Sequence, residues 1–163
     1  MSNEKKLSHL DQAGKANMVD VSAKTINARK AKASCKIFMN EIAFALVKEN
    51  SSKKGDVLAV ARIAGIMAAK KTSELIPLCH QLNLSKVEIN FTLSNSECSI
   101  IVLAITSTTD RTGVEMEALV AASVASLTVY DMLKAVDKSI RITDIVLNFK
   151  DGGKSGTFTR EKS

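Results

Sequence analysis

The chain has 163 residues and a formal net charge of +6, with 45% hydrophobic and 25% charged residues. This is the length of one ordinary domain, and a chain of this size buries about 68–70% of its unfolded surface when it folds. The composition excludes a disordered, collagen-like or low-complexity protein. We therefore expect a single folded domain over residues 1–163.

The positive charge lies mainly at the two ends of the sequence. Residues 1–36 carry eight Lys or Arg against three Asp or Glu, and residues 150–163 carry four against two, whereas residues 37–149 carry eleven against twelve. Nucleic-acid-binding domains concentrate basic residues on the folded body, and RNA binding adds aromatic residues that stack on bases. The chain has only five Phe, one Tyr and no Trp. We expect no nucleic-acid partner, and the basic ends are either solvated, mobile segments or attract a small polyanion such as a nucleotide triphosphate.

Neither a membrane partner nor a metal site is expected. No window approaches 18 uninterrupted apolar residues, and the first residues are polar, without the apolar run of a signal peptide. Cys35, Cys79 and Cys98 are far apart and have neither a Cys-x-x-Cys motif nor a His at the spacing of zinc ligands. We expect free thiols in a reducing, cytoplasmic compartment.

The first quarter of the chain predicts an arm, a strand and a short helix. Residues 1–29 are mostly small and polar without a sustained period, which is typical of a mobile N-terminal arm. Apolar residues alternate over 33–39, which predicts a strand. Asn40 then stands where an N-cap is expected, directly before a helix over 41–49.

A long helix and a hairpin follow. Asp56 is the expected N-cap of a helix over residues 57–75, which is rich in alanine and ends before Pro77. Its small side chains predict close packing against a neighbouring element. Residues 87–91 and 100–105 both predict strands, and the turn residues between them favour an antiparallel hairpin.

The last elements complete the pattern. Residues 117–136 predict a largely buried helix, residues 140–149 a final strand with a bulge at residues 143–144, and residues 151–163 a C-terminal tail. The order is strand, helix, helix, strand, strand, helix, strand. This order predicts an α+β domain with a ferredoxin-like antiparallel sheet and helices packed on one face.

Several polar side chains have the chemistry of a catalytic or anion-binding site. Lys54 precedes a glycine on a loop, where most lysines serve only solubility, and His80 lies on the loop after Pro77, where structural and functional roles are equally common. Two carboxylates near the start of the last helix favour its dipole without any ligand, and an Asp and a Lys near its end form an ordinary ion pair in the simplest interpretation. These four residues are Glu115, Glu117, Asp131 and Lys134.

The length of this last helix limits how these residues work together. Glu117 and Asp131 are 14 residues apart, so a continuous helix separates them by about 21 Å. One compact site cannot use both from one chain. Either only one end of the helix matters, or two subunits share each site.

Ten short segments carry specific motifs, of which Pro-Leu-Cys-His at 77–80 and Glu-Met-Glu at 115–117 are the most distinctive. The segments are 18–24, 54–57, 61–65, 69–72, 75–80, 112–119, 121–125, 130–132, 134–136 and 152–156. In this order, and over almost the whole chain, they resemble the cyclic pyranopterin monophosphate synthase family, also called the molybdenum cofactor biosynthesis protein C family. The chain departs from the pattern at Gln81, where proline is usual, and at Asp110-Arg111, where the family has a shorter polar link with a lysine.

The resemblance implies a lyase. The family converts cyclised dihydro-GTP, which is 3',8-cyclo-7,8-dihydroguanosine 5'-triphosphate, to cyclic pyranopterin monophosphate and releases pyrophosphate in molybdenum cofactor biosynthesis. The resemblance implies no redox cofactor and assigns no metal ligand. It also implies a homohexamer, a trimer of dimers, with sites at the subunit interfaces. The alternative from another class is a non-catalytic nucleotide- or RNA-binding ferredoxin-like module, which only the basic ends favour.

The resemblance also assigns roles to individual residues. By motif, Asp131 and Lys134 resemble the catalytic pair, and Lys54 a third catalytic residue. The segments that resemble substrate-contacting ones contain Leu78, Cys79, His80, Met116 and Glu117, with Glu115, Arg29 and Lys150 as further candidates.

Overall fold

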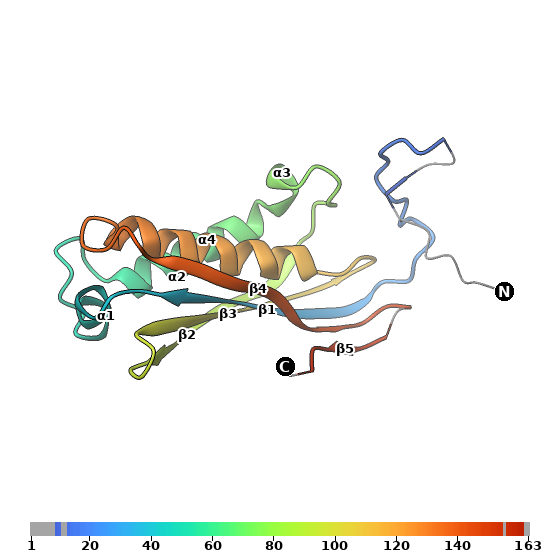
Figure 1. The fold of residues 1–163 in the computed structure, drawn as a ribbon. Coiled ribbons are helices and arrows are strands. Elements are labelled where there is room, and N and C mark those ends of the chain that lie inside the picture. Colours follow the sequence, from blue (N-terminus) through green and yellow to red (C-terminus); the bar gives the residue numbers. More distant parts are fainter. Residues whose placement is uncertain (1–8, 11–12, 155, 162–163) are drawn as a thin grey trace.

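The computed structural model describes residues 9–10, 13–154 and 156–161. Nine elements follow one another along the chain (Figure 1). In order they are β1 (Asn27–Phe38), α1 (Glu41–Lys48), α2 (Val57–Lys70), α3 (Thr72–Leu75), β2 (Leu84–Ser94), β3 (Ser99–Asp110), α4 (Glu115–Leu133), β4 (Arg141–Asp151) and β5 (Phe158–Thr159).

The strands form one antiparallel sheet in the order β2-β3-β1-β4-β5. β1 and β2 run in the same direction with β3 between them, and this arrangement is the split βαβ unit of ferredoxin-like folds. The helices α2 and α4 lie along one face of the sheet (Figure 1). The expected α+β, ferredoxin-like sheet with helices on one face is therefore confirmed.

The central helix α4 contributes many of the buried side chains of the domain. Ten of its residues are buried, and six of them form the main core together with inward-facing residues of β1 and β3. The length and composition of α4 would suffice for a membrane span, since an 18-residue window of the helix has a mean hydropathy of 1.4. However, 56% of this window is buried inside the domain. A buried core helix passes the same compositional test, so the packing assigns α4 to the core.

α2 packs antiparallel against α4 along a seam of small side chains. A Cβ atom added at Gly65 would lie 2.8 Å from the carbonyl oxygen of Ala121 and 3.1 Å from the Cβ of Ala125. Ala61, Ala68 and Ala69 are also buried on α2. The close approach predicted from the alanine-rich sequence is confirmed, and it fixes how the ends of the two helices face one another.

Both predicted N-caps are present. The side chain of Asn40 accepts a hydrogen bond from the amide of Ala43 at 2.8 Å, and that of Asp56 accepts one from the amide of Ala59 at 2.9 Å. The helix expected over residues 57–75 is wrong in its extent, because α2 ends at Lys70 and a separate turn, α3, follows. At this break the buried Thr72 hydroxyl donates to the carbonyl oxygen of Ala69. The side chain thus satisfies a backbone acceptor at the end of α2 that a backbone amide would bond if the helix continued.

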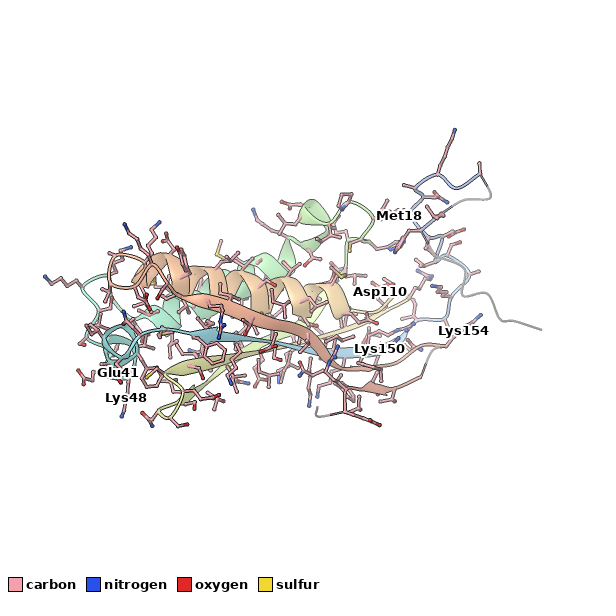
Figure 2. The ribbon with its side chains drawn as sticks, viewed as in Figure 1. Met18, Glu41, Lys48, Asp110, Lys150 and Lys154 are labelled. Carbon is pink, nitrogen blue, oxygen red and sulfur yellow. The ribbon has the colours of Figure 1, made fainter. Side chains whose placement is uncertain are left out.

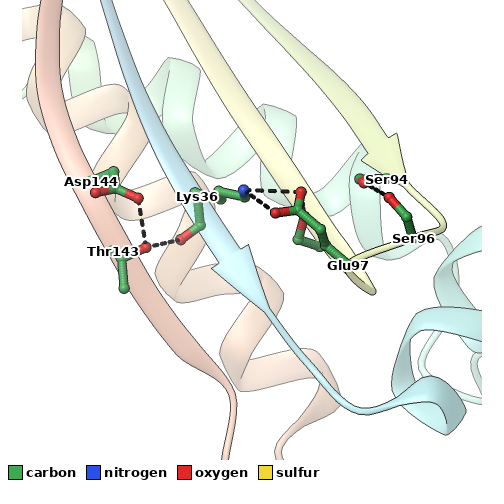
Figure 3. Close-up of polar contacts among 7 residues, drawn as sticks. Lys36, Ser94, Ser96, Glu97, Thr143 and Asp144 are labelled. Atoms are coloured by element: carbon green, nitrogen blue, oxygen red, sulfur yellow. Dashed lines mark hydrogen bonds and ion pairs between the residues drawn. The ribbon is translucent and has the colours of Figure 1, made fainter. Parts of the chain in front are cut away.

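The bulge predicted at residues 143–144 is present. Asp144 has φ +54, and the pairing of β4 with β1 shifts register between Ser34 and Lys36. Figure 3 shows the Thr143 hydroxyl between the carbonyl oxygen of Lys36, at 3.5 Å, and Oδ2 of Asp144, at 3.0 Å. The extra residue is thus held by side-chain hydrogen bonds where the ladder is interrupted.

Other boundaries differ from the sequence predictions as well: β2 covers 84–94 instead of 87–91, and α4 covers 115–133 instead of 117–136. β3 continues to Asp110 through a stretch expected to be a polar link, because the hydroxyls of Thr106 and Thr108 donate to the carbonyl oxygens of Val114 and Asn83. β1 begins at Asn27, inside the segment expected as an arm, and of that arm residues 1–8 and 11–12 lie outside the described residues. The expected C-terminal tail contains β5, which pairs with the edge of β4.

Candidate functional site

Lys54, Asp131 and Lys134 meet at the C-terminal end of α4, and we call them the lysine–aspartate cluster. Nζ of Lys134 lies 2.7 Å from Oδ1 of Asp131, and Nζ of Lys54 donates to the backbone oxygen of Asp131 at 3.0 Å. The antiparallel packing of α2 on α4 brings about this meeting, since the turn before α2 lies beside the last turn of α4. All three catalytic candidates are therefore brought together.

Charge complementarity controls protonation in this cluster. The hydrogen bond and charge of Lys134 lower the pKa of Asp131, and the same interaction raises the pKa of Lys134. The Asp131 and Lys134 side chains are 63% and 52% exposed. The cluster is thus a solvated anion–cation pair with a second ammonium group beside it, and a substrate can reach all three side chains.

A second group of candidates lies at the opposite, N-terminal end of α4. They line a cavity of about 240 Å³, which we call the carboxylate pocket. Its lining contains six of the predicted residues: Leu78, Cys79, His80, Glu115, Met116 and Glu117. His80 is held at its rim, with Nε2 at 2.8 Å from the backbone oxygen of Val19.

Glu117 is the most perturbed acid of the carboxylate pocket. It is only 4% exposed, and burial raises its pKa to about 7, with the nearby charge of Glu115 adding to the shift. Burial also raises the pKa of the Cys79 thiol, with a smaller contribution from the charge of Glu117. A carboxyl group with a pKa near neutrality exchanges a proton readily at the pH of the cell, as a general acid or base requires.

A larger cavity of about 480 Å³ adjoins the carboxylate pocket and shares Thr112, Gly113 and Glu115 with it. We call it the cation pocket. It is lined by five basic side chains and one carboxylate: Lys24, Arg29, Arg111, Lys150, Lys154 and Glu115. In Figure 2, Asp110, Lys150 and Lys154 lie near one another at the end of the sheet where β3 and β4 terminate. The excess of positive charge makes this a site for an anion with several charges.

The backbone around the cation pocket holds Arg29 in place. Its Nε donates to the backbone oxygen of Asp110 at 3.3 Å, and its Nη2 to that of Arg111 at 3.1 Å. Gly152 has φ +95, and a Cβ there would lie 2.8 Å from Cδ of Arg29. Only glycine allows the chain after β4 to press this closely on the Arg29 side chain. Lys150 is positioned separately, by an ion pair of 3.6 Å with Glu115.

Three basic residues of the cation pocket were not among the sequence candidates. Lys24 and Lys154 belong to the motifs at 18–24 and 152–156, and Arg111 stands where the sequence departs from the family pattern. Within the described part of the chain, none of the three side chains has an ion pair, and Nε of Arg111 is buried without a hydrogen-bond partner. Spacing carried no signal for them, because they come from three segments that only the folded sheet brings together.

The structure thus separates the candidates into two groups. The lysine–aspartate cluster lies at one end of α4, and the carboxylate and cation pockets lie at the other. A helix of 19 residues spans about 27 Å between its first and last Cα atoms. Over the residues that the structure describes, no group of three or more His, Cys, Asp or Glu is arranged to hold a metal ion.

Comparison with known proteins places the chain among related sequences. The MoaC family matches residues 18–153. A cyclic pyranopterin monophosphate synthase of Campylobacter jejuni (strain RM1221) is 56% identical over 95% of this chain and 99% of its own length. The enzymes of the same name from Chloroflexus aggregans and Heliobacterium modesticaldum are 54% and 52% identical over 96% of this chain. This chain therefore belongs to the MoaC family.

Proposed function

We propose that the protein is a cyclic pyranopterin monophosphate synthase, a lyase of molybdenum cofactor biosynthesis. It converts cyclised dihydro-GTP to cyclic pyranopterin monophosphate and releases pyrophosphate. The observation that carries this proposal is the identity of 52–56% to relatives of that name over nearly the whole chain. The side chains that the reaction needs agree with it, because the three catalytic candidates meet at one end of α4.

The lysine–aspartate cluster supplies the proton transfers. The reaction opens a purine-derived ring and closes a cyclic phosphate, and both events move protons to or from ring and ribose atoms. Their mutual hydrogen bond leaves Asp131 ionised and Lys134 protonated. Asp131 therefore has the form that accepts a proton, and Lys134 the form that donates one. Lys54 adds a second ammonium that stabilises negative charge on the phosphate that is attacked.

The cation pocket binds the triphosphate. It combines five basic side chains with one carboxylate, and the start of α4 contributes the positive end of its dipole. Arg29 and Arg111 provide planar guanidinium groups, which bind phosphate oxygens in pairs. This pocket then stabilises the pyrophosphate that leaves. The proposal requires no redox cofactor.

Each active site is composite in this proposal. The proton-transferring residues and the triphosphate-binding residues lie at opposite ends of α4, and no bend in this helix brings its ends together. We propose a homohexamer, a trimer of dimers, in which the cation and carboxylate pockets of one subunit face the lysine–aspartate cluster of another. We also propose that the enzyme acts in the cytoplasm, without a nucleic-acid or membrane partner.

An activity assay tests the proposal directly. Purified protein is incubated with cyclised dihydro-GTP, and both the pterin product and pyrophosphate are quantified over time. We expect the two products in equal amounts, and about 10²- to 10⁴-fold slower formation of both by the Lys134→Ala variant. If the protein binds the substrate tightly but forms neither product, the alternative of a non-catalytic nucleotide-binding module replaces this proposal.

A further inference from the structure

The last described residues form a strap along the outer edge of β4. We use the name C-terminal strap for Thr157–Arg160, which includes β5. Phe158 and Thr159 pair with Lys150 and Phe149. These residues lie beyond residue 153, where the match to the MoaC family ends.

Side chains of the strap reinforce this pairing at both of its ends. The Thr157 hydroxyl donates to Oδ1 of Asp151 at 2.7 Å, and this bond is the main cause of the lowered pKa of Asp151. Nε of Arg160 donates to the backbone oxygen of Leu147 at 2.9 Å, while its backbone amide donates to the oxygen of Asn148 at 2.8 Å. The strap thus engages each residue of β4 from 147 to 151, through the hydrogen bonds to residues 147, 148 and 151 and through strand pairing at 149 and 150.

The segment of β4 that the strap holds leads directly into the cation pocket. Lys150 and the glycines at 152 and 153 line that pocket, and the glycines press on the Arg29 side chain. On its other edge this part of β4 pairs with β1, from Lys30 opposite Asp151 to Lys32 opposite Phe149. Without the strap, the terminal residues of β4 would be held from one edge only.

The strap itself does not reach the cation pocket, since none of residues 157–160 lines it. Phe158 is 39% exposed, so the strap does not contribute a large buried core residue either. Its contacts with β4 are mainly backbone and polar hydrogen bonds. Such contacts fix the position of a strand without adding much apolar burial, and this is the property expected of a positioning element.

We propose that the C-terminal strap is a positioning element of the triphosphate subsite. By clamping residues 147–151 it holds Lys150 and the Gly152–Gly153 backbone against Arg29, so that the basic side chains are arranged for polyphosphate before substrate arrives. Thr157 and Arg160 are the positioning residues. This inference rests on the proposed function, and it adds a role for residues outside the family match.

Two variants test the strap. One deletes residues 156–163, and the other, Thr157→Val, removes only the hydroxyl group and changes no charge. Thr159→Ala is the matched control, because Thr159 pairs with Phe149 through its backbone and its side chain is exposed. The measurements are hydrogen exchange of the amides of residues 147–152, the Kd for inorganic triphosphate by calorimetry, and kcat and KM with cyclised dihydro-GTP.

We expect the deletion to speed exchange at residues 147–152 and to raise both the triphosphate Kd and KM about tenfold, with kcat unchanged within about twofold. Thr157→Val should raise Kd and KM about two- to threefold, and Thr159→Ala should change neither. The inference is overturned if exchange speeds up while Kd and KM stay at the wild-type values, or if wild-type protein binds no triphosphate. If the strap controls triphosphate binding but no variant or wild-type protein turns over, the proposed function fails and the strap assignment stands.

Discussion

The two ends of α4 shift the pKa of a carboxyl group in opposite directions. Asp131, at the C-terminal end, is exposed and paired with Lys134, so its pKa is lowered and it stays ionised. Glu117, near the N-terminal end, is almost fully buried, and its pKa rises to about 7. The sequence alone shows two acids on one helix, whereas their surroundings give them different protonation states. At one end the carboxyl group is therefore kept in its charged form by a neighbouring cation, and at the other it titrates near neutrality.

The largest effect on turnover is expected from substitutions in the lysine–aspartate cluster. Lys54→Ala and Lys134→Ala should each reduce kcat by about 10²- to 10⁴-fold, the usual contribution of a positioned acid or base. Both side chains are exposed and contribute no core volume, so circular dichroism and the thermal unfolding midpoint should match the wild type. Near-normal turnover by a folded variant would remove that lysine from the catalytic group.

The separation of the two ends is tested by mixing inactive subunits. Glu117→Ala and Lys134→Ala proteins are dissociated, mixed and reassembled, and each variant alone goes through the same treatment. If sites are shared, some mixed interfaces carry neither lesion, and activity should return to about a quarter of the wild-type value for random pairing of two subunits. Mass spectrometry must confirm mixed oligomers. Mixed oligomers without recovered activity would show that each site uses only one end of the helix.

The burial of Glu117 predicts how the stability of the protein depends on pH. Because the folded pKa of Glu117 lies above its unfolded value, the folded protein binds more protons between about pH 4.5 and 7. The contribution of Glu117 to the free energy of unfolding is fully present below pH 4.5 and is lost as the pH rises through 7. Glu117→Gln should remove this loss and raise the free energy of unfolding at pH 8 by about 2 kcal/mol relative to the wild type.

The measurement is urea unfolding of both proteins at pH 5, 6, 7 and 8. The difference between Glu117→Gln and wild type isolates this one group, since every other titrating residue is common to both. A difference that stays constant over this range would mean that Glu117 is ionised in the folded protein.

The smallest effect is expected in the cation pocket. Arg111 is one of five basic side chains there, so Arg111→Ala should raise KM about tenfold and leave kcat nearly unchanged. Arg111→Lys should recover part of the loss, because a lysine keeps the charge but not the planar pair of donors. Titration calorimetry with inorganic triphosphate checks the affinity independently of turnover. Equal affinity of the alanine variant and the wild type would exclude Arg111 from the site.

The sequence predicted the framework of the fold because its signals are local. Asn40 and Asp56 cap helices by reaching only three residues along the chain, and alternation of apolar residues reports which side of a strand is buried. The extension of β3 to Asp110 was missed because its polar residues are satisfied by distant partners, as when Thr108 donates to Asn83. β5 was missed because two residues contain no pattern, and only the adjacent edge of β4 makes them a strand.

The candidate site likewise has features that the sequence predicted and features that only the folded structure shows. Motifs identified Asp131, Lys134 and Lys54, and the fold brings these three together. The raised pKa of Glu117 was not accessible from the sequence, since it depends on how completely the surrounding chain excludes water. The role of Arg111 at the cation pocket was likewise hidden, because its neighbours come from both ends of the chain.

The seam of small residues between α2 and α4 has a consequence for enzyme engineering. Gly65 lies so close to Ala121 and Ala125 that a larger residue there cannot be added without separating the helices. The turn before α2 carries Lys54, which donates to the backbone oxygen of Asp131 in the last turn of α4. A library that randomises this seam would therefore disturb catalysis along with stability, whereas loops such as residues 77–83 offer positions where pocket shape can change without moving the helices.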